Sequence, residues 1–193
     1  MILDVRGTHG SGKSYIAHQL LSYGCEEIVG YNEYKKKESI LGYSVPSLDL
    51  AVIGKYESQC GGCDGVGSSD EVCRRVRVFS KNYRHVVLEG ILVAHTFQRY
   101  HTLATELTRE GHPYVFAFLD TPLETCIERV KFRRLAKGNQ KELNPNNITR
   151  DHHNIFTVVR RKCMTAGHTV IVLPHLDPMY DVINLLTGAT RAT

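Results

Sequence analysis

The sequence contains no hydrophobic run longer than a strand, which excludes a membrane-spanning helix of about 20 predominantly apolar residues. Met1 leads directly into a strand pattern without a basic segment or a cleavage site, so we expect no secretion signal. Internal repeats, low-complexity tracts and linker-like stretches are absent as well. We therefore expect residues 1–193 to form a single domain located in the cytoplasm.

The cysteines lack the arrangement that a structural zinc site requires. Of the six cysteines, only Cys60 and Cys63 form a C-x-x-C pair, whereas a four-ligand zinc site needs a second pair. Recruitment of Cys73 and a histidine is the alternative that stays open. Without a secretion signal we expect reduced thiols rather than a disulfide framework.

The net charge of +4 is small, but the basic residues are clustered. Between Ile127 and Lys162 there are ten Lys or Arg residues and three acidic residues. Further clusters lie at 35–37 and 74–77. Two interpretations are open: solvated helix faces with a phosphate-handling lid, or a groove for a polyanion such as nucleic acid.

Apolar runs of strand length alternate with helix-like stretches along the chain. We expect strands at 2–5, 27–31, 85–90, 114–120 and 169–174. We expect helices from Lys13, over about 70–83 and 92–110, after Pro122, up to about Ala166, and over 178–187. The stretch 40–56 breaks at Pro46, which indicates an irregular hairpin or insertion. This alternation predicts an α/β fold with a parallel sheet between two layers of helices.

The strongest motif lies where the first expected strand meets the first expected helix. The segment GTHGSGKS matches the phosphate-loop pattern G-x-x-x-x-G-K-[ST] at every fixed position. Glycines let the backbone curl so that N–H groups point inward, and the helix N-terminus adds positive partial charge. We expect Lys13 to reach the outer phosphates of a nucleoside triphosphate and Ser14 to ligate Mg²⁺. The expected nucleotide-binding residues are Gly7, Thr8, His9, Gly10, Ser11, Gly12, Lys13 and Ser14.

Two further features complete a phosphoryl-transfer site. Glu89 ends the buried strand pattern VVLEG, where its carboxylate can hold Mg²⁺ directly or through water. The helix after Pro122 places Arg129 and Arg133 on one face. We expect a lid over 133–148, with arginines that neutralise phosphoryl oxygens as the lid excludes water. An ordinary strand-end acid and a solvated basic helix are the competing interpretations.

The phosphate loop, the LEG strand, the lid helix and the final strand together resemble the nucleoside and nucleotide kinase group of P-loop proteins. The Asn-Lys-x-Asp guanine reader that GTPase switches usually carry is absent. The resemblance implies a kinase that uses ATP and Mg²⁺, a five-stranded parallel sheet, and adenine bound near residues 174–177. The segment VVLEGIL (86–92) looks like the corresponding strand of uridine kinases.

A narrower resemblance lies in the middle of the chain. The segment IGKYESQCGGCDG (53–65) resembles a stretch in phage-encoded P-loop kinases that phosphorylate the hydroxymethyl group of 5-hydroxymethyluracil in DNA. This resemblance implies a DNA substrate and, for a phage-encoded chain, the host cytoplasm. We expect a substrate-side insertion over 31–68, in which Gly61 and Gly62 permit close backbone approach and Tyr56 offers a stacking face.

The acceptor hydroxyl is a poor nucleophile, so a general base is expected beside it. Of the candidates Asp64, Glu33 and Glu89, we favour Asp64 for substrate contact and Glu89 for the metal, with Glu33 in reserve. Asp-Gly turn chemistry explains Asp64 equally well. Either a displaced base or simple packing accounts for the aromatic residues Tyr31, Tyr34, Tyr43 and Tyr56. A kinase for a free nucleoside or nucleotide and a non-catalytic nucleotide-binding regulatory module are the alternative functions.

Overall fold

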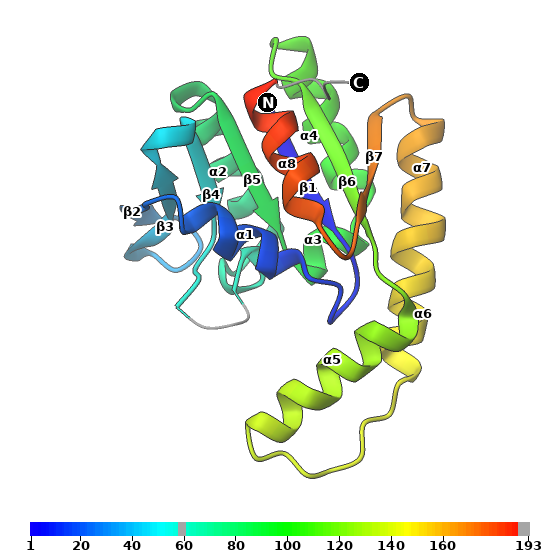
Figure 1. Ribbon diagram of the computed structural model, residues 1–193. Coiled ribbons are helices and arrows are strands. Elements are labelled where there is room, and N and C mark those ends of the chain that lie inside the picture. Colours follow the sequence, from blue (N-terminus) through cyan, green and yellow to red (C-terminus); the bar gives the residue numbers. More distant parts are fainter. Residues whose placement is uncertain (58–60, 189–193) are drawn as a thin grey trace.

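The computed structural model describes residues 1–57 and 61–188, which form one sheet with helices on both faces (Figure 1). The strands are β1 (Ile2–Arg6), β2 (Glu26–Asn32), β3 (Lys37–Val45), β4 (Leu50–Ile53), β5 (His85–Glu89), β6 (Tyr114–Asp120) and β7 (Thr169–Pro174). The α-helices are α1 (Lys13–Leu21), α2 (Ser69–Asn82), α3 (Ile91–His95), α4 (Gln98–Arg109), α5 (Leu123–Ala136), α6 (Asn146–His153), α7 (Arg160–Thr165) and α8 (Pro178–Thr187). A π-helical stretch, η3 (Asn154–Val159), joins α6 to α7. No helix in the described residues is long and apolar enough to cross a membrane.

The sheet has seven strands in the order β2-β3-β4-β5-β1-β6-β7. Strands β4, β5, β1, β6 and β7 run parallel, whereas β2 and β3 are antiparallel additions at one edge. The expected five-stranded, all-parallel sheet is therefore wrong. Residues 33–36 alone connect β2 to β3, and a parallel connection needs about a dozen residues or more. The predicted hairpin at 40–56 is part of this antiparallel edge.

The two faces of the sheet bury two separate apolar clusters. Helices α2, α3, α4 and α7 and the stretch η3 cover one face, where Phe79, Tyr100 and Phe116 are buried. Helices α1 and α8 cover the other, where Ile16 and Leu173 are buried. Because both faces are covered, the central strands are buried throughout, as their apolar sequence runs predict.

The expected single helix over 92–110 is wrong, because the chain breaks it into α3 and α4. Thr96 between them has extended backbone angles. The buried guanidinium of Arg6 donates from Nη1 to the carbonyls of Ala94, at 3.4 Å, and Thr96, at 3.2 Å. Those carbonyl groups at the end of α3 thus bind a side chain of β1 instead of continuing the helix. The contact ties α3 to the strand that precedes the phosphate loop.

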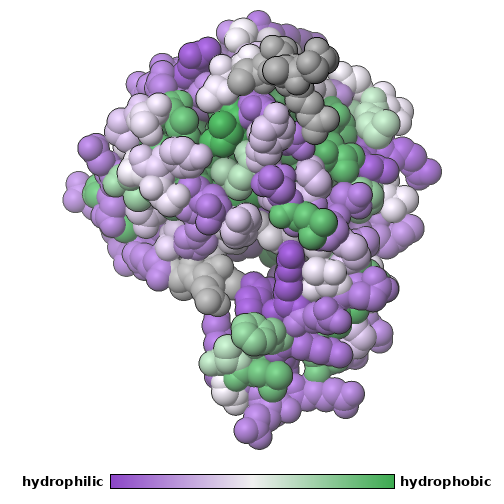
Figure 2. Space-filling view, viewed as in Figure 1, coloured by the Kyte–Doolittle hydropathy of each residue, from purple (hydrophilic) through white to green (hydrophobic). Residues whose placement is uncertain are grey.

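Helices α5 and α6 project from the body as an arm beyond the carboxyl edge of the sheet (Figure 1). The residues expected as a lid, 133–148, span the end of α5, the connecting loop and the start of α6. Figure 2 shows hydrophobic surface at the far end of this arm, where Phe132 and Leu135 are exposed, amid a largely hydrophilic surface. The arm lies on the side of the sheet that carries the phosphate loop.

A buried ion pair fixes the start of α2 and predicts a pH-dependent stability. Glu71 accepts from Arg75 Nε at 2.9 Å and from Arg74 Nε at 2.8 Å. Burial alone would raise the pKa of Glu71, but the hydrogen bonds from these arginines outweigh it and lower the pKa. This stabilisation is complete above the unfolded-state pKa and is lost as pH falls through the folded-state pKa. We expect Glu71→Gln to cost about 1–3 kcal/mol of unfolding free energy at pH 7, and less below about pH 4.

Urea unfolding of the wild type and Glu71→Gln at pH 7 and pH 3.5 measures this difference. The matched control is Glu106→Gln, because Glu106 pairs with Arg77 in a much more exposed bidentate contact at 2.6 Å. We expect the control to cost about 0–1 kcal/mol. A Glu71→Gln deficit that is equally large at both pH values would contradict the assignment of the stabilisation to the ionised carboxylate.

Candidate active site

The phosphate loop lies at the carboxyl end of β1, in the middle of the sheet, and leads into α1. Gly10 and Gly12 have φ angles of 80° and 105°, in the left-handed region that glycine adopts without steric cost. A side chain at Gly10 would also overlap the backbone carbonyl of Cys126 in α5. Thr121 donates from its hydroxyl to the Ser11 carbonyl at 2.7 Å. The segment that starts the arm therefore holds the loop in shape.

Lys13 and Ser14 begin α1 and face the end of β5. Lys13 Nζ donates to the carbonyls of Gly7, at 2.8 Å, and Thr8, at 3.0 Å. Ser14 Oγ donates to Glu89 Oε1 at 3.1 Å. Burial lowers the pKa of Lys13, while the nearby Glu89 carboxylate opposes that shift. The three side chains expected to bind phosphate and metal are thus brought together.

Glu89 is buried at the end of β5, with 2% of its surface exposed. Burial raises its pKa, and the Lys13 charge and the Ser14 hydrogen bond act in the opposite direction. Gly62 has a φ of 84°, and a side chain there would overlap the Glu89 carboxylate. The close backbone approach expected at Gly62 therefore brings the Gly62 backbone next to the Glu89 carboxylate.

Tyr56 is only 7% exposed, so the expected open stacking face is wrong for this residue. Its ring packs against His18 and Tyr43, with centroids 5.5 Å and 6.2 Å away. Its hydroxyl donates to the Ile53 carbonyl at 3.4 Å, and burial raises its pKa well above the ordinary value. The ring fills apolar space beneath α1, which a sequence pattern does not reveal.

Asp64, in the short 3₁₀ turn η2 (Cys63–Gly65), caps the start of α3. Its Oδ2 accepts from the Ile91 amide at 2.8 Å and its Oδ1 accepts from the Leu92 amide at 3.0 Å. Both oxygens are thus engaged by backbone donors, although Asp64 and Gly61 also line the cavity described next. The contact joins residues far apart in sequence, so neither of the two interpretations of Asp64 anticipated it.

A cavity of about 770 Å³ opens beside the phosphate loop and extends along α5 (Figure 2). Arg129 and Arg133 both line it, in agreement with their predicted common face. Arg129 Nη1 donates to the carbonyls of Gly10, at 3.3 Å, and Ser11, at 3.5 Å. Positive charge from the arm therefore lies directly against the loop.

Apolar side chains also line this cavity, and one of them, Phe132, is a residue that sequence reasoning did not single out. Leu176, 85% exposed, lies in the loop after β7, where a resemblance to nucleotide kinases implies the adenine. Phe132, 73% exposed, lines the cavity from α5. The signal for a nucleobase site is that both exposed apolar side chains line the same cavity.

Glu33, held in reserve as a general base, lies outside this cavity, in the turn between β2 and β3. It is exposed and pairs with Lys36 at 3.4 Å. Lys35 Nζ, beside it, donates to the Gly65 carbonyl at 2.7 Å. The hairpin tip therefore contacts η2, while its acidic side chain points to solvent.

The described residues contain no group of three or more His, Cys, Asp or Glu side chains placed to hold a metal ion. Cys63 is buried and lies 3.9 Å from the Ile53 carbonyl, and Cys60 lies outside the described residues.

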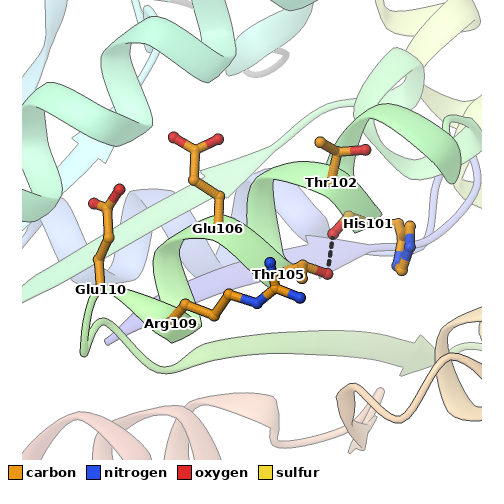
Figure 3. A pocket seen from close by; sticks show the side chains of 6 residues that line it. All are labelled: His101, Thr102, Thr105, Glu106, Arg109 and Glu110. Atoms are coloured by element: carbon orange, nitrogen blue, oxygen red, sulfur yellow. Dashed lines mark hydrogen bonds between the residues drawn. The ribbon is translucent and has the colours of Figure 1, made fainter.

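A hollow of about 420 Å³ on α4 lies away from the site (Figure 3). Its side chains stand along the α4 surface, and none is an expected phosphate ligand.

Comparison with known proteins decides the family. The model of the 5-hmdU DNA kinase family matches residues 1–167. The chain belongs to this family. A 5-hmdU DNA kinase of Pseudomonas phage PaMx11 is 34% identical over 193 residues, with 97% of each chain covered. Another, of Delftia phage PhiW-14, is 24% identical over 199 residues, covering 95% of this chain and 72% of its own. A solved structure of deoxyadenosine kinase from M. mycoides has a TM-score of 0.48 at 13% identity, covering 97% and 100% of the two chains.

Membership in the 5-hmdU DNA kinases confirms the resemblance predicted from the phosphate loop and from segment 53–65. The predicted assignment to the kinases is confirmed with it. The matched range contains the phosphate loop, Glu89 and the arm of this kinase, and ends before β7. Leu176, in the loop after β7, thus lies beyond the part of the chain that the family model matches, whereas Phe132 lies within it.

Proposed function

We propose that this chain transfers the γ-phosphoryl group of ATP to the hydroxymethyl oxygen of 5-hydroxymethyluracil in DNA. The observation that carries the proposal is one cavity lined by the phosphate loop, the hydrogen-bonded Ser14 and Glu89, and two arginines, in a member of the 5-hmdU DNA kinase family. The names of the relatives do not favour the free-nucleoside alternative. The loop amides and Lys13 hold the phosphates, and Arg129 and Arg133 neutralise the equatorial oxygens.

The residues present fit a magnesium ion. Ser14 and Glu89 supply oxygen donors 3.1 Å apart, the ligand type that Mg²⁺ prefers. Burial raises the Glu89 pKa, and a cation would offset the cost of that buried charge. Ser14 and Glu89 would hold the ion, and a bound Mg²⁺ would neutralise the charge that develops on the phosphate oxygens.

The reaction forms a bond from the hydroxymethyl oxygen to the γ-phosphorus as the bond to the β–γ bridging oxygen breaks and ADP leaves. We assign the role of general base to His9, which lines the cavity and whose imidazole accepts the proton of the hydroxyl group. Partial desolvation and the charge of Lys13 lower the pKa of His9, so its ring is neutral and can accept a proton at pH 7. Asp64 has both oxygens engaged, which supports a positioning role at the start of α3.

DNA must present the target base outside the stack, either flipped or single-stranded. The hairpin tip between β2 and β3 carries Lys35, Lys36 and Lys37 and contacts η2, which lines the cavity through Asp64. We assign these lysines, with the basic arm, to the phosphate backbone of the DNA. Binding is then expected to weaken as salt rises.

Radiolabelled ATP offered with three acceptor pools tests the function. The pools are an oligonucleotide with one 5-hydroxymethyluracil, free nucleosides and nucleotides, and no acceptor. We expect label only in the oligonucleotide, and none in a matched thymine oligonucleotide. If label appears only in a free nucleoside, the acceptor is that nucleoside and not DNA. Tight ATP binding without transfer to any acceptor would favour a regulatory module.

Glu89→Gln is expected to lower kcat about 100-fold and to raise the Mg²⁺ concentration that gives half-maximal rate. The substitution keeps the shape but removes the charge that faces Ser14. The matched control is Glu128→Gln, since Glu128 lines the same cavity from α5 and we expect near wild-type turnover. A magnesium titration of each variant makes the comparison, and an unchanged requirement in Glu89→Gln would remove Glu89 from the metal site.

A further inference from the structure

A second hollow, of about 670 Å³, lies beside the nucleotide cavity and shares two lining residues with it. The shared residues are His9, in the phosphate loop, and Ile91, at the start of α3. The opposite wall comes from α6 and the start of η3, including Asp151 and Asn154. A ligand in this hollow therefore lies next to the phosphate loop, since His9 of that loop lines both spaces.

Side-chain contacts join the two walls of this second hollow. His95, on α3, has its Nε2 3.5 Å from Asp151 Oδ1 and its Nδ1 3.1 Å from Asn154 Nδ2. Thr8 donates from its hydroxyl to the Ile148 carbonyl at 3.4 Å, which ties α6 to the phosphate loop. The π-helical stretch also begins at Asn154, and such stretches frequently occur at functional sites. The hollow is thus built from the loop, α3 and the base of the arm.

The lining offers what a pyrimidine base requires. Leu92 is an apolar side chain, 61% exposed, at the edge of this hollow and can cover a base face. Asn154 carries an acceptor oxygen and an NH₂ group that keeps one proton beyond its contact with His95, and these match the alternating groups on the edge of uracil. Arg150 is exposed beside them, with its Nε 3.5 Å from Asp151 Oδ1, and its outer nitrogens offer a cation to the adjoining DNA phosphate. The combination of an apolar face and a polar edge is how flipped bases are held.

We propose that this second hollow holds the extruded pyrimidine base, with Leu92 against its face, Asn154 at its edge, and its hydroxymethyl group directed past His9 to the phosphate loop. This inference rests on the proposed function. It places the acceptor oxygen next to the γ-phosphoryl group, where the two hollows meet, with His9 beside that oxygen to take the hydroxyl proton.

Steady-state kinetics with an oligonucleotide that contains one 5-hydroxymethyluracil test the proposal. Leu92→Trp fills the hollow and Asn154→Asp removes its donor, so each is expected to raise KM for the oligonucleotide about tenfold while ATP affinity stays unchanged. The matched control is Met164→Trp, an apolar residue of α7 with 59% exposure that lines neither cavity. The control is expected to behave as the wild type does.

The outcomes separate the two proposals. If the wild-type protein does not label the oligonucleotide, the proposed function itself is wrong. A wild type that labels it, together with unchanged KM in both Leu92→Trp and Asn154→Asp, overturns the second hollow as the acceptor site and leaves the function standing. Equal losses of ATP affinity in these variants also overturn it, because the substitutions would then act on the nucleotide cavity. Circular dichroism checks that each variant is folded.

Discussion

Replacement of Lys13 by alanine is expected to lower kcat for phosphoryl transfer about 10³-fold or more while the chain stays folded. Lys13 is the first residue of α1, and its ammonium lies against the carbonyls of Gly7 and Thr8. From there its positive charge lies next to any phosphate that the loop holds. Its removal leaves the loop amides in place but withdraws the full positive charge that offsets the transferred group.

Labelled-phosphate transfer under saturating ATP measures this effect, and thermal unfolding checks the fold. Lys81→Ala is the matched control, because Lys81 is an exposed lysine near the end of α2 that does not line the cavity. We expect wild-type turnover from the control. A Lys13→Ala variant that keeps wild-type turnover would remove the phosphate loop from the mechanism.

Replacement of Arg6 by methionine is expected to lower the free energy of unfolding by about 3–5 kcal/mol, because it leaves the buried carboxylate of Asp4 without its partner. Both side chains are fully buried, and Arg6 Nη2 lies 2.7 Å from Asp4 Oδ2. The guanidinium also lies over the rings of Tyr100 and Phe116, at 5.3 Å and 4.8 Å from their centroids. The variant therefore loses packing as well as an ion pair.

The double variant Asp4→Leu with Arg6→Met separates the two causes in urea unfolding. Removal of both charges is expected to recover much of the loss, since a buried pair contributes little net stability over apolar replacements. A single Arg6→Met variant that costs less than about 1 kcal/mol would contradict the buried ion pair. Equal losses in the single and double variants would attribute the effect to packing and to the Arg6 contacts with α3.

Sequence patterns within a single segment predicted those parts of the candidate site whose arrangement depends only on residues close together in the sequence. The phosphate loop is one contiguous segment, in which Gly10 and Gly12 have positive φ angles and Ser14 contacts Glu89. Glu89 was predictable because it ends an apolar strand next to β1. Arg129 and Arg133 followed from helical spacing, which needs no knowledge of the rest of the chain.

Contacts between distant segments were not predictable in this way. Arg6 breaks the helix at Thr96, 90 residues away in sequence, through a backbone carbonyl that carries no sequence signal. Asp64 reaches the amides of α3, and the Tyr56 ring is covered by α1. The antiparallel edge was open to prediction, because a connection as short as 33–36 cannot join parallel strands.

The structure of the chain with a non-hydrolysable ATP analogue and Mg²⁺ tests the central claim most directly. The account predicts the β- and γ-phosphates within hydrogen-bond reach of Lys13 Nζ, the ion beside Ser14 and Glu89, and the base between Phe132 and Leu176. A nucleotide bound elsewhere, with the loop between β1 and α1 left without phosphate, would contradict it.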